Sequence, residues 1–159
     1  ADEERFKSLR KLYKERGSGF QCANVKVTCE DQHRKESSLD ALFRKYDVPK
    51  DLTLISIDVD GIDYWLLNSI MESEYRPRII VRVSHIHFIH THTHIFIQVV
   101  EFNPTIPHSV IYITPKSDTI RHGSSLAAFD ELMHKFKYVL VETTTYNAFF
   151  VPLELYERS

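Results

Sequence analysis

The sequence predicts an α/β domain built on an open, doubly wound sheet that ends in an antiparallel hairpin. Short apolar runs rich in β-branched residues alternate along the chain with segments of helical periodicity, which is typical of this fold class. The run at 54–57 leads directly into an acidic turn that contains Gly61, and a helical pattern follows the turn. The last two expected strands, 138–144 and 147–155, are joined by a tight turn, so we expect them to pair antiparallel.

Amphipathic helices are expected in several segments. Residues 1–16 place Phe6 and Leu9 on one face, with acidic residues at the start and basic residues toward the end, as the helix dipole favours. Serines stand where N-caps would lie, at Ser38 and Ser125. The other expected helices are 39–46, 64–73 and 126–136. Further strands are expected at 20–28, at 79–81 and in the run that begins at Val99.

The composition is that of an ordinary globular domain. The chain has 159 residues, of which 43% are hydrophobic and 26% charged, so we expect residues 1–159 to form a single domain. The net charge of −2 and the lack of a basic face argue against nucleic acid as a partner. We see no signal peptide and no apolar run of about 18 residues, so we expect no membrane partner. Cys22 and Cys29 lack the spacing of a metal or redox motif, which indicates a reducing compartment such as the cytoplasm.

Three acidic residues follow the apolar run at 54–57. In open α/β sheets, ligands bind beyond the carboxyl ends of the strands, so Asp58, Asp60 and Asp63 stand where a polar small molecule would be held. The alternative is structural, because carboxylates at a helix N-terminus satisfy free N–H groups and the helix dipole. We favour the structural role for Asp63 and a functional role for Asp58 and Asp60.

Glu101 and Asn103 mark a second strand end. A carboxylate at that position can act as a general base, and an amide can orient a substrate. The alternative, which we weigh equally, is that Asn103 and Pro104 only form a turn.

Four motifs follow one another along the chain: IDVDGIDYW from Ile57, VVEFNPTIP from Val99, HGSSLAAF from His122 and YNAFFV from Tyr146. In this order they resemble the motifs of FkbM-like methyltransferase domains, which have the S-adenosylmethionine-dependent methyltransferase fold. In that family the first of these motifs ends the fourth strand, beside the methyl donor and acceptor, and an acidic-Asn-Pro turn ends the fifth. The resemblance therefore implies a Rossmann-like methyltransferase sheet.

The resemblance also implies an enzyme that moves a methyl group from S-adenosylmethionine to a small-molecule or glycan-like acceptor. An acid near the acceptor would remove a proton, and positioning would dominate the catalysis. The catalytic residues implied are Asp58, Asp60, Glu101 and Asn103. The cofactor-binding residues implied are Asp2, Glu3, Asn24 and Asp58.

One departure from the family pattern concerns the donor side of the sheet. The family's first strand and glycine-rich turn would precede the first residue, because Asp2 and Glu3 already stand at the end of the second strand. We therefore expect an amino-terminally truncated domain with a partial sheet, which can be inactive. A missing central strand leaves open edges and exposed apolar surface. We expect oligomerisation or another segment that completes the sheet.

A histidine-rich insertion, residues 83–98, interrupts the expected fifth strand. It holds five of the nine histidines of the chain. His90, His92 and His94 alternate, so a strand would project them from one face, where imidazoles bind Zn²⁺, Cu²⁺ or Ni²⁺. The same alternation is also plain low complexity.

We favour a third explanation, in which the insertion is an intron translated in frame. Without residues 83–98, Arg82 would join Val99 in one continuous strand. Val-Ser can be encoded by a splice donor, Gln98 by an acceptor, and alternating His-Thr by a CA repeat. Sequencing of the spliced transcript tests this hypothesis. A benign insertion and a metal site remain as alternatives, and a noncatalytic remnant or interaction module remains as an alternative function.

Overall fold

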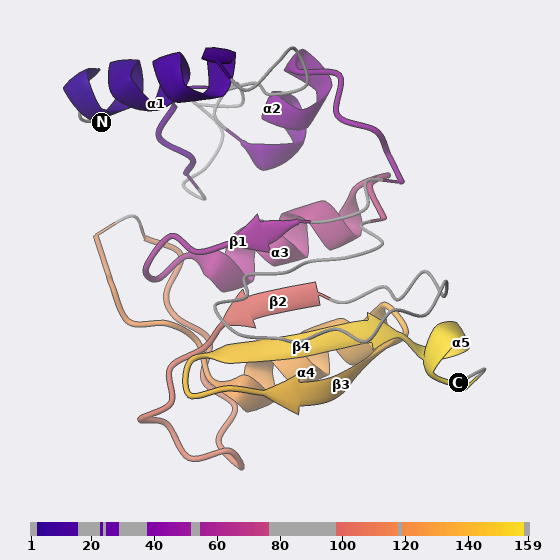
Figure 1. The fold of residues 1–159 in the computed structure, drawn as a ribbon. Helices are drawn as coiled ribbons and strands as arrows, with labels where there is room; N and C mark the ends of the chain where they lie inside the picture. Colours follow the sequence, from indigo (N-terminus) through magenta and orange to yellow (C-terminus); the bar gives the residue numbers. More distant parts are fainter. Residues whose placement is uncertain are drawn as a thin grey trace.

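The computed structural model describes residues 3–15, 23, 25–28, 38–51, 55–76, 98–117 and 119–157. Helices and strands alternate along much of this part of the chain (Figure 1). The helices are α1 (Glu3–Glu15), α2 (Leu39–Lys45), α3 (Asp63–Glu72), α4 (Leu126–Lys135) and α5 (Leu153–Tyr156). The strands are β1 (Ser56–Ile57), β2 (Gln98–Glu101), β3 (Tyr138–Thr143) and β4 (Asn147–Pro152).

Within the described residues the strands form one open, mixed sheet in the order β1-β2-β4-β3. Strands β1 and β2 are parallel, with Ile57 opposite Val100. Strand β4 lies antiparallel between β2 and β3, and the register of β3 and β4 shifts between Leu140 and Glu142. The predicted α/β class and the predicted antiparallel hairpin at the end of the chain are therefore confirmed.

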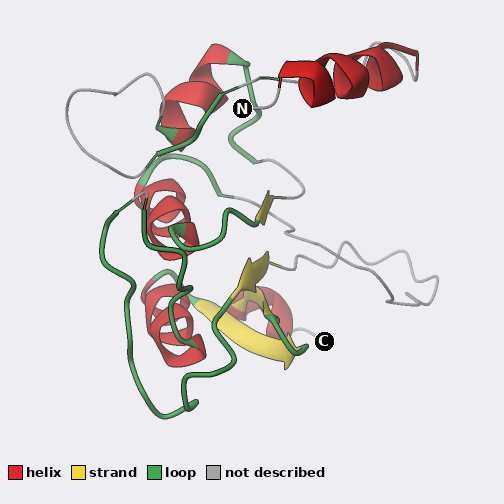
Figure 2. Cartoon of the chain, turned by 90° about the vertical axis from the view of Figure 1, so that its left-hand side faces the viewer, coloured by secondary structure: helices red, strands yellow, loops and turns green. Residues whose placement is uncertain are grey.

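Helices α3 and α4 lie on the same face of the sheet (Figure 2). The core forms where their apolar faces meet the strands, and Leu67, Phe129 and Phe150 are completely buried in it. Tyr64 of α3 and Phe129 of α4 join the two helices through a ring contact at 5.7 Å between centroids. This packing fixes the positions of β1 and β2 against the helices, and thereby the positions of the side chains that follow both strands.

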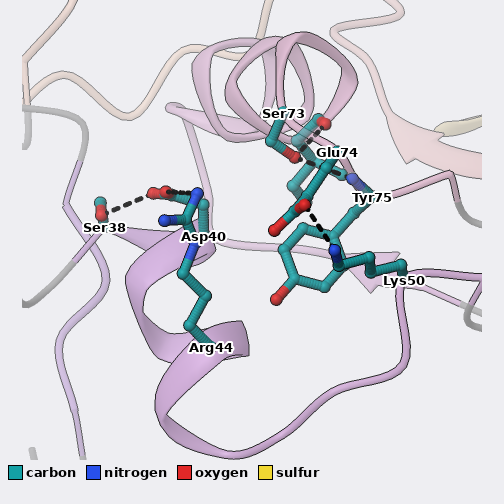
Figure 3. A network of polar contacts seen from close by, with 8 residues as sticks. Ser38, Asp40, Arg44, Lys50, Ser73, Glu74 and Tyr75 are labelled. Carbon is teal, nitrogen blue, oxygen red and sulfur yellow. Dashed lines mark hydrogen bonds and ion pairs between the residues drawn. The ribbon is translucent and has the colours of Figure 1, made fainter.

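Helix α2 and the residues after it pack against the segment that follows α3 (Figure 3). Lys50 Nζ lies 2.7 Å from a carboxylate oxygen of Glu74, and the rings of Phe43 and Tyr75 meet edge to face at 5.1 Å. The expected cap Ser38 does occupy the N-cap position, but its hydroxyl donates to Asp40 instead of accepting from a backbone N–H. Ser125, the other expected cap, accepts a hydrogen bond from Ala128 N as predicted.

The expected strand at 20–28 is wrong for the residues that the structure describes, since 23 and 25–28 hold no strand. Thr28 is buried and Val25 is exposed, and the pairings of the described strands do not include residues 25–28. Alternation of polar and apolar residues alone is a weak signal, because strand formation depends on the packing around it. The expected strand at 147–155 ends at Pro152, because proline has no N–H to continue the ladder, and α5 follows.

Helix α1 has the predicted amphipathic pattern, but Leu9 and Leu12 are each 44–45% exposed. No helix in the described part of the chain is long and apolar enough to cross a membrane. Several predictions concern residues that lie outside the described ranges. These are the strand at 79–81, residues 83–97 of the insertion, and the two cysteines.

Candidate functional site

The carboxyl ends of β1 and β2 lie side by side, because the two strands are neighbours and parallel. Both arrowheads point to the same side of the molecule (Figure 1). The register places Asp58 and Glu101 one step beyond the pair formed by Ile57 and Val100. Two acids that are far apart in the sequence are therefore brought together at one edge of the sheet, as the interpretation of the strand ends requires.

The turn between β1 and α3 is held by Asp63. Its carboxylate accepts hydrogen bonds from Val59 N at 3.0 Å and from Gly61 N at 2.9 Å. The side chain is almost completely buried, and this burial raises its pKa above the ordinary value of 3.8. The structural role that we favoured for Asp63 is therefore the one observed. The N–H groups that it satisfies belong to the preceding turn.

Gly61 allows a second segment of chain to close over this turn. Its φ is +138°, and a Cβ atom at this position would collide with the backbone carbonyl of Ile120. Asp60, beside it, has a φ of 54°, which is in the left-handed region that aspartate tolerates. The contact brings Arg121 near the acids, with its Nη1 3.8 Å from Asp60 Oδ2 in an exposed ion pair.

Asp58, Asp60 and Glu101 form an acidic cluster, whose carboxylate oxygens lie within 4.8 Å of one another. Glu101 is partly buried, and this desolvation raises its pKa to about 7, with further contributions from the charge and hydrogen bond of Asp58 and from the charge of Asp60. Glu101 is therefore protonated in a large fraction of molecules at neutral pH and can exchange a proton with a ligand. The same oxygens also suit a hard cation, because Mg²⁺ and Ca²⁺ prefer oxygen ligands.

Asn103 shapes the second strand end. Its backbone N–H donates to Ser124 O at 2.9 Å, and its side-chain oxygen accepts from Thr105 N at 2.9 Å and from Thr105 Oγ1 at 2.7 Å. The turn-forming role that we weighed for Asn103 is therefore present. Within the described residues the side-chain nitrogen makes no hydrogen bond, so it can still donate to a ligand.

A cleft of about 270 Å³ lies between these two turns. Its wall contains Arg121 and Tyr146, which are not among the predicted site residues. In the sequence, each of them lies far from the ends of β1 and β2. Phe102 N donates to Tyr146 O at 2.8 Å, which ties the hairpin turn to the end of β2. The lining residues are Asp60, Gly61, Asp63, Glu101, Phe102, Asn103, Pro104, Thr105, Arg121, His122, Gly123 and Tyr146.

Larger depressions of about 740 and 720 Å³ lie beside α5 and beside α4, respectively. Neither is at the carboxyl ends of β1 and β2, and neither contains any of the three clustered acids. We therefore place the site at the smaller cleft, where titratable groups converge.

Comparisons with models of protein families, with curated proteins and with solved structures find no match. The interpretation of the cleft therefore depends on its own geometry and on the motifs that form it.

The residues predicted to bind the cofactor are only partly described. Asp58 lies in the acidic cluster. Glu3 is exposed in the first turn of α1 and does not line the cleft. Asp2 and Asn24 lie outside the described residues, as do the alternative metal ligands His90, His92 and His94.

Proposed function

We propose that this chain is an S-adenosylmethionine-dependent methyltransferase-like domain, and that the cleft between the ends of β1 and β2 receives the methyl acceptor. The observation that carries the proposal is the position of Glu101. Glu101 is the last residue of β2, where it lines the cleft beside other acids, and its pKa is about 7. A group with this pKa is suited to accept a proton near neutral pH.

The pairing of the strands supports a Rossmann-like methyltransferase sheet. The family resemblance expects IDVDG and the acidic-Asn-Pro turn to end two neighbouring parallel strands, and here they follow β1 and β2. It also expects a reversed hairpin at the end of the sheet, and β4 is antiparallel to both of its neighbours. The order and direction of the described strands therefore agree with the carboxy-terminal part of such a sheet.

The acidic residues beside the cleft suit the methyl donor. S-adenosylmethionine carries positive charge on its sulfonium and amino groups and supplies an activated methyl group when it is bound. Asp58 and Asp60 offer carboxylates of complementary charge at this edge. The cleft itself, at about 270 Å³, is close to the lower end of the range for small-molecule sites, so it suits a small acceptor.

The residues of the chain would act on the acceptor. Glu101 in its ionised form takes the proton that a hydroxyl acceptor loses as its oxygen forms the new bond to carbon. The side-chain nitrogen of Asn103 donates a hydrogen bond that orients the acceptor oxygen, while its side-chain oxygen keeps the turn in place. The neighbouring Asp58 sets the proton affinity of Glu101.

A methyl-transfer assay tests this proposal. The chain is incubated with S-adenosylmethionine and a panel of hydroxyl-bearing small molecules and glycans, and S-adenosylhomocysteine is measured. We expect turnover that falls about 10²- to 10⁴-fold in Glu101→Gln, the range usual for loss of a general base. Glu154→Gln serves as a matched control, because it makes the same exchange at an exposed residue of α5 that does not line the cleft. The alternative, a noncatalytic interaction module, predicts no turnover above the level without enzyme.

A further inference from the structure

The connection between β2 and α4 carries a continuous apolar run on the surface of the molecule. It lies on the side of the molecule to which β1 and β2 point (Figure 1). Val110, Ile111, Tyr112 and Ile113 are consecutive and exposed by 44, 59, 37 and 38%, respectively. Single exposed apolar side chains are normal in globular proteins, whereas a contiguous run of large ones indicates a surface that is covered by a partner.

The backbone of this run is hydrogen-bonded along one edge only. Tyr112 N donates to Ser125 Oγ at 2.9 Å, and Tyr112 O accepts from Ser125 N at 2.9 Å. Thr114 N donates to Ser124 Oγ at 3.0 Å, and Thr114 O accepts from Trp65 Nε1 at 2.8 Å. The backbone N–H and C=O groups of alternate residues therefore point toward the body of the protein, which is the two-residue period of a β-strand.

The backbone groups of the intervening residues, Ile111 and Ile113, belong to the opposite edge of the run. Within the described residues, the backbone N–H and C=O groups of Ile111 and Ile113 make no hydrogen bond. The run thus has the form of an edge strand, with one edge satisfied and one open. Edges of this kind pair readily with another strand.

We propose that two copies of this chain pair through this open edge, antiparallel and about a two-fold axis at Tyr112. In this register Ile111 of one copy lies opposite Ile113 of the other, and each pair exchanges both of its N–H···O=C bonds. Every open backbone group of the two isoleucines then finds a partner. The pairing is isologous, because the same residues contribute from both copies.

A second copy fits this edge for two reasons that are visible in the chain. The open groups are self-complementary, since Ile111 and Ile113 are equidistant from Tyr112. Residues 109–115 also contain no charged side chain, so two copies can approach without repulsion. The exposed apolar side chains would pack across the strand pair and leave water on association.

Crosslinking tests the register directly. In an antiparallel pair, residues opposite each other at a non-hydrogen-bonded position have Cα atoms about 4.5 Å apart, which is within the range of a disulfide. Tyr112→Cys, made together with Cys22→Ser and Cys29→Ser, should therefore form a covalent dimer under mild oxidation. The control is Tyr156→Cys in the same background, because Tyr156 is 58% exposed in α5. Crosslinking of Tyr112→Cys no faster than that of Tyr156→Cys would overturn the proposal.

Sedimentation velocity on the unmodified chain gives a second, independent measurement. We expect a concentration-dependent dimer, and we expect Ile111→Pro to remain monomeric at the same concentrations. Proline removes only the N–H that faces outward, so the inward bonds of Tyr112 and the circular dichroism spectrum should be unchanged. A chain that is monomeric at all concentrations, or an Ile111→Pro variant that is folded and dimerises as well as the original chain, would contradict the pairing.

Discussion

Asp58 and Glu101 follow the paired residues Ile57 and Val100 at the ends of two adjacent parallel strands, and a carboxylate oxygen of each lies within 4.8 Å of the other. Burial of Glu101 and the negative charge of Asp58 beside it raise the pKa of Glu101 to about 7. The pair therefore holds a proton at this edge of the sheet, where a ligand can compete for it.

This relationship predicts how stability depends on pH. The pKa of Glu101 in the folded chain is raised from its ordinary value of 4.5 to about 7. Between pH 4.5 and about pH 7 the folded state therefore binds more protons than the unfolded state. The contribution of Glu101 to stability is thus fully present below pH 4.5 and is lost as the pH rises through about 7. Glu101→Gln should therefore raise Tm above this pH, by roughly 2–4 °C per kcal/mol regained, and should change it little in acid. Thermal unfolding across the pH range measures the effect, and a Tm difference that does not depend on pH would argue against the shared proton.

Gly61 should be far less tolerant of substitution than Gly123. Gly61→Ala places a side chain at a φ of +138° and against Ile120 O. We expect the free energy of unfolding to fall by about 1–3 kcal/mol from backbone strain, and further because of the collision. Gly123→Ala is the matched control, because the atom nearest to its Cβ would be Asn103 N, at 3.4 Å. Urea unfolding of both variants provides the comparison. Equal losses would mean that the close approach of the two segments does not require glycine at residue 61.

Asp63 should matter for stability more than its acidic neighbour Asp60. Asp63→Ala leaves the N–H groups of Val59 and Gly61 without their acceptor, and each unsatisfied buried donor costs about 1–3 kcal/mol. Asp60→Asn keeps a side chain that tolerates the left-handed backbone and loses only an exposed ion pair with Arg121, so it should cost less than about 1 kcal/mol. Chemical denaturation of both variants decides the order, and a larger loss for Asp60→Asn would contradict the assigned roles.

Asn103 offers a way to separate turn formation from ligand binding. Asn103→Asp retains an oxygen that can accept from Thr105 N, so the turn and the stability should be kept, but the side-chain N–H groups that would hydrogen-bond the methyl acceptor are lost. Asn103→Ala removes both functions and should lower stability by about 1 kcal/mol as well as activity. Methyl transfer and Tm are measured for both variants. Full activity in Asn103→Asp would remove the side-chain nitrogen from the proposed mechanism.

The elements that could be predicted from sequence are those whose signal is local. The closing hairpin, α4 with its Ser125 cap, and the acids after β1 each depend on a few consecutive residues. An acid at the start of α3 could also be expected, because helix N-termini favour acids, but its hydrogen bonds with Val59 N and Gly61 N in the preceding turn could not. Helix α5 was missed because the apolar pattern continues past Pro152, whose missing N–H ends the strand.

The parts of the site that could not be predicted depend on contacts between distant segments. Arg121 reaches the cleft only because Gly61 lets residues 120–121 close over the turn. Tyr146 reaches it through the hydrogen bond from Phe102 N. The raised pKa of Glu101 likewise requires Asp58 beside it, which the strand order provides and no local pattern shows.

Isothermal titration calorimetry with S-adenosylmethionine tests the central claim most directly. The chain should bind the donor with saturable heat, and more tightly than it binds S-adenosylhomocysteine, because only the former carries the sulfonium charge that Asp58 and Asp60 complement. Binding should weaken in Asp58→Asn. A folded chain that takes up neither compound, with its circular dichroism spectrum unchanged, would contradict the methyltransferase proposal.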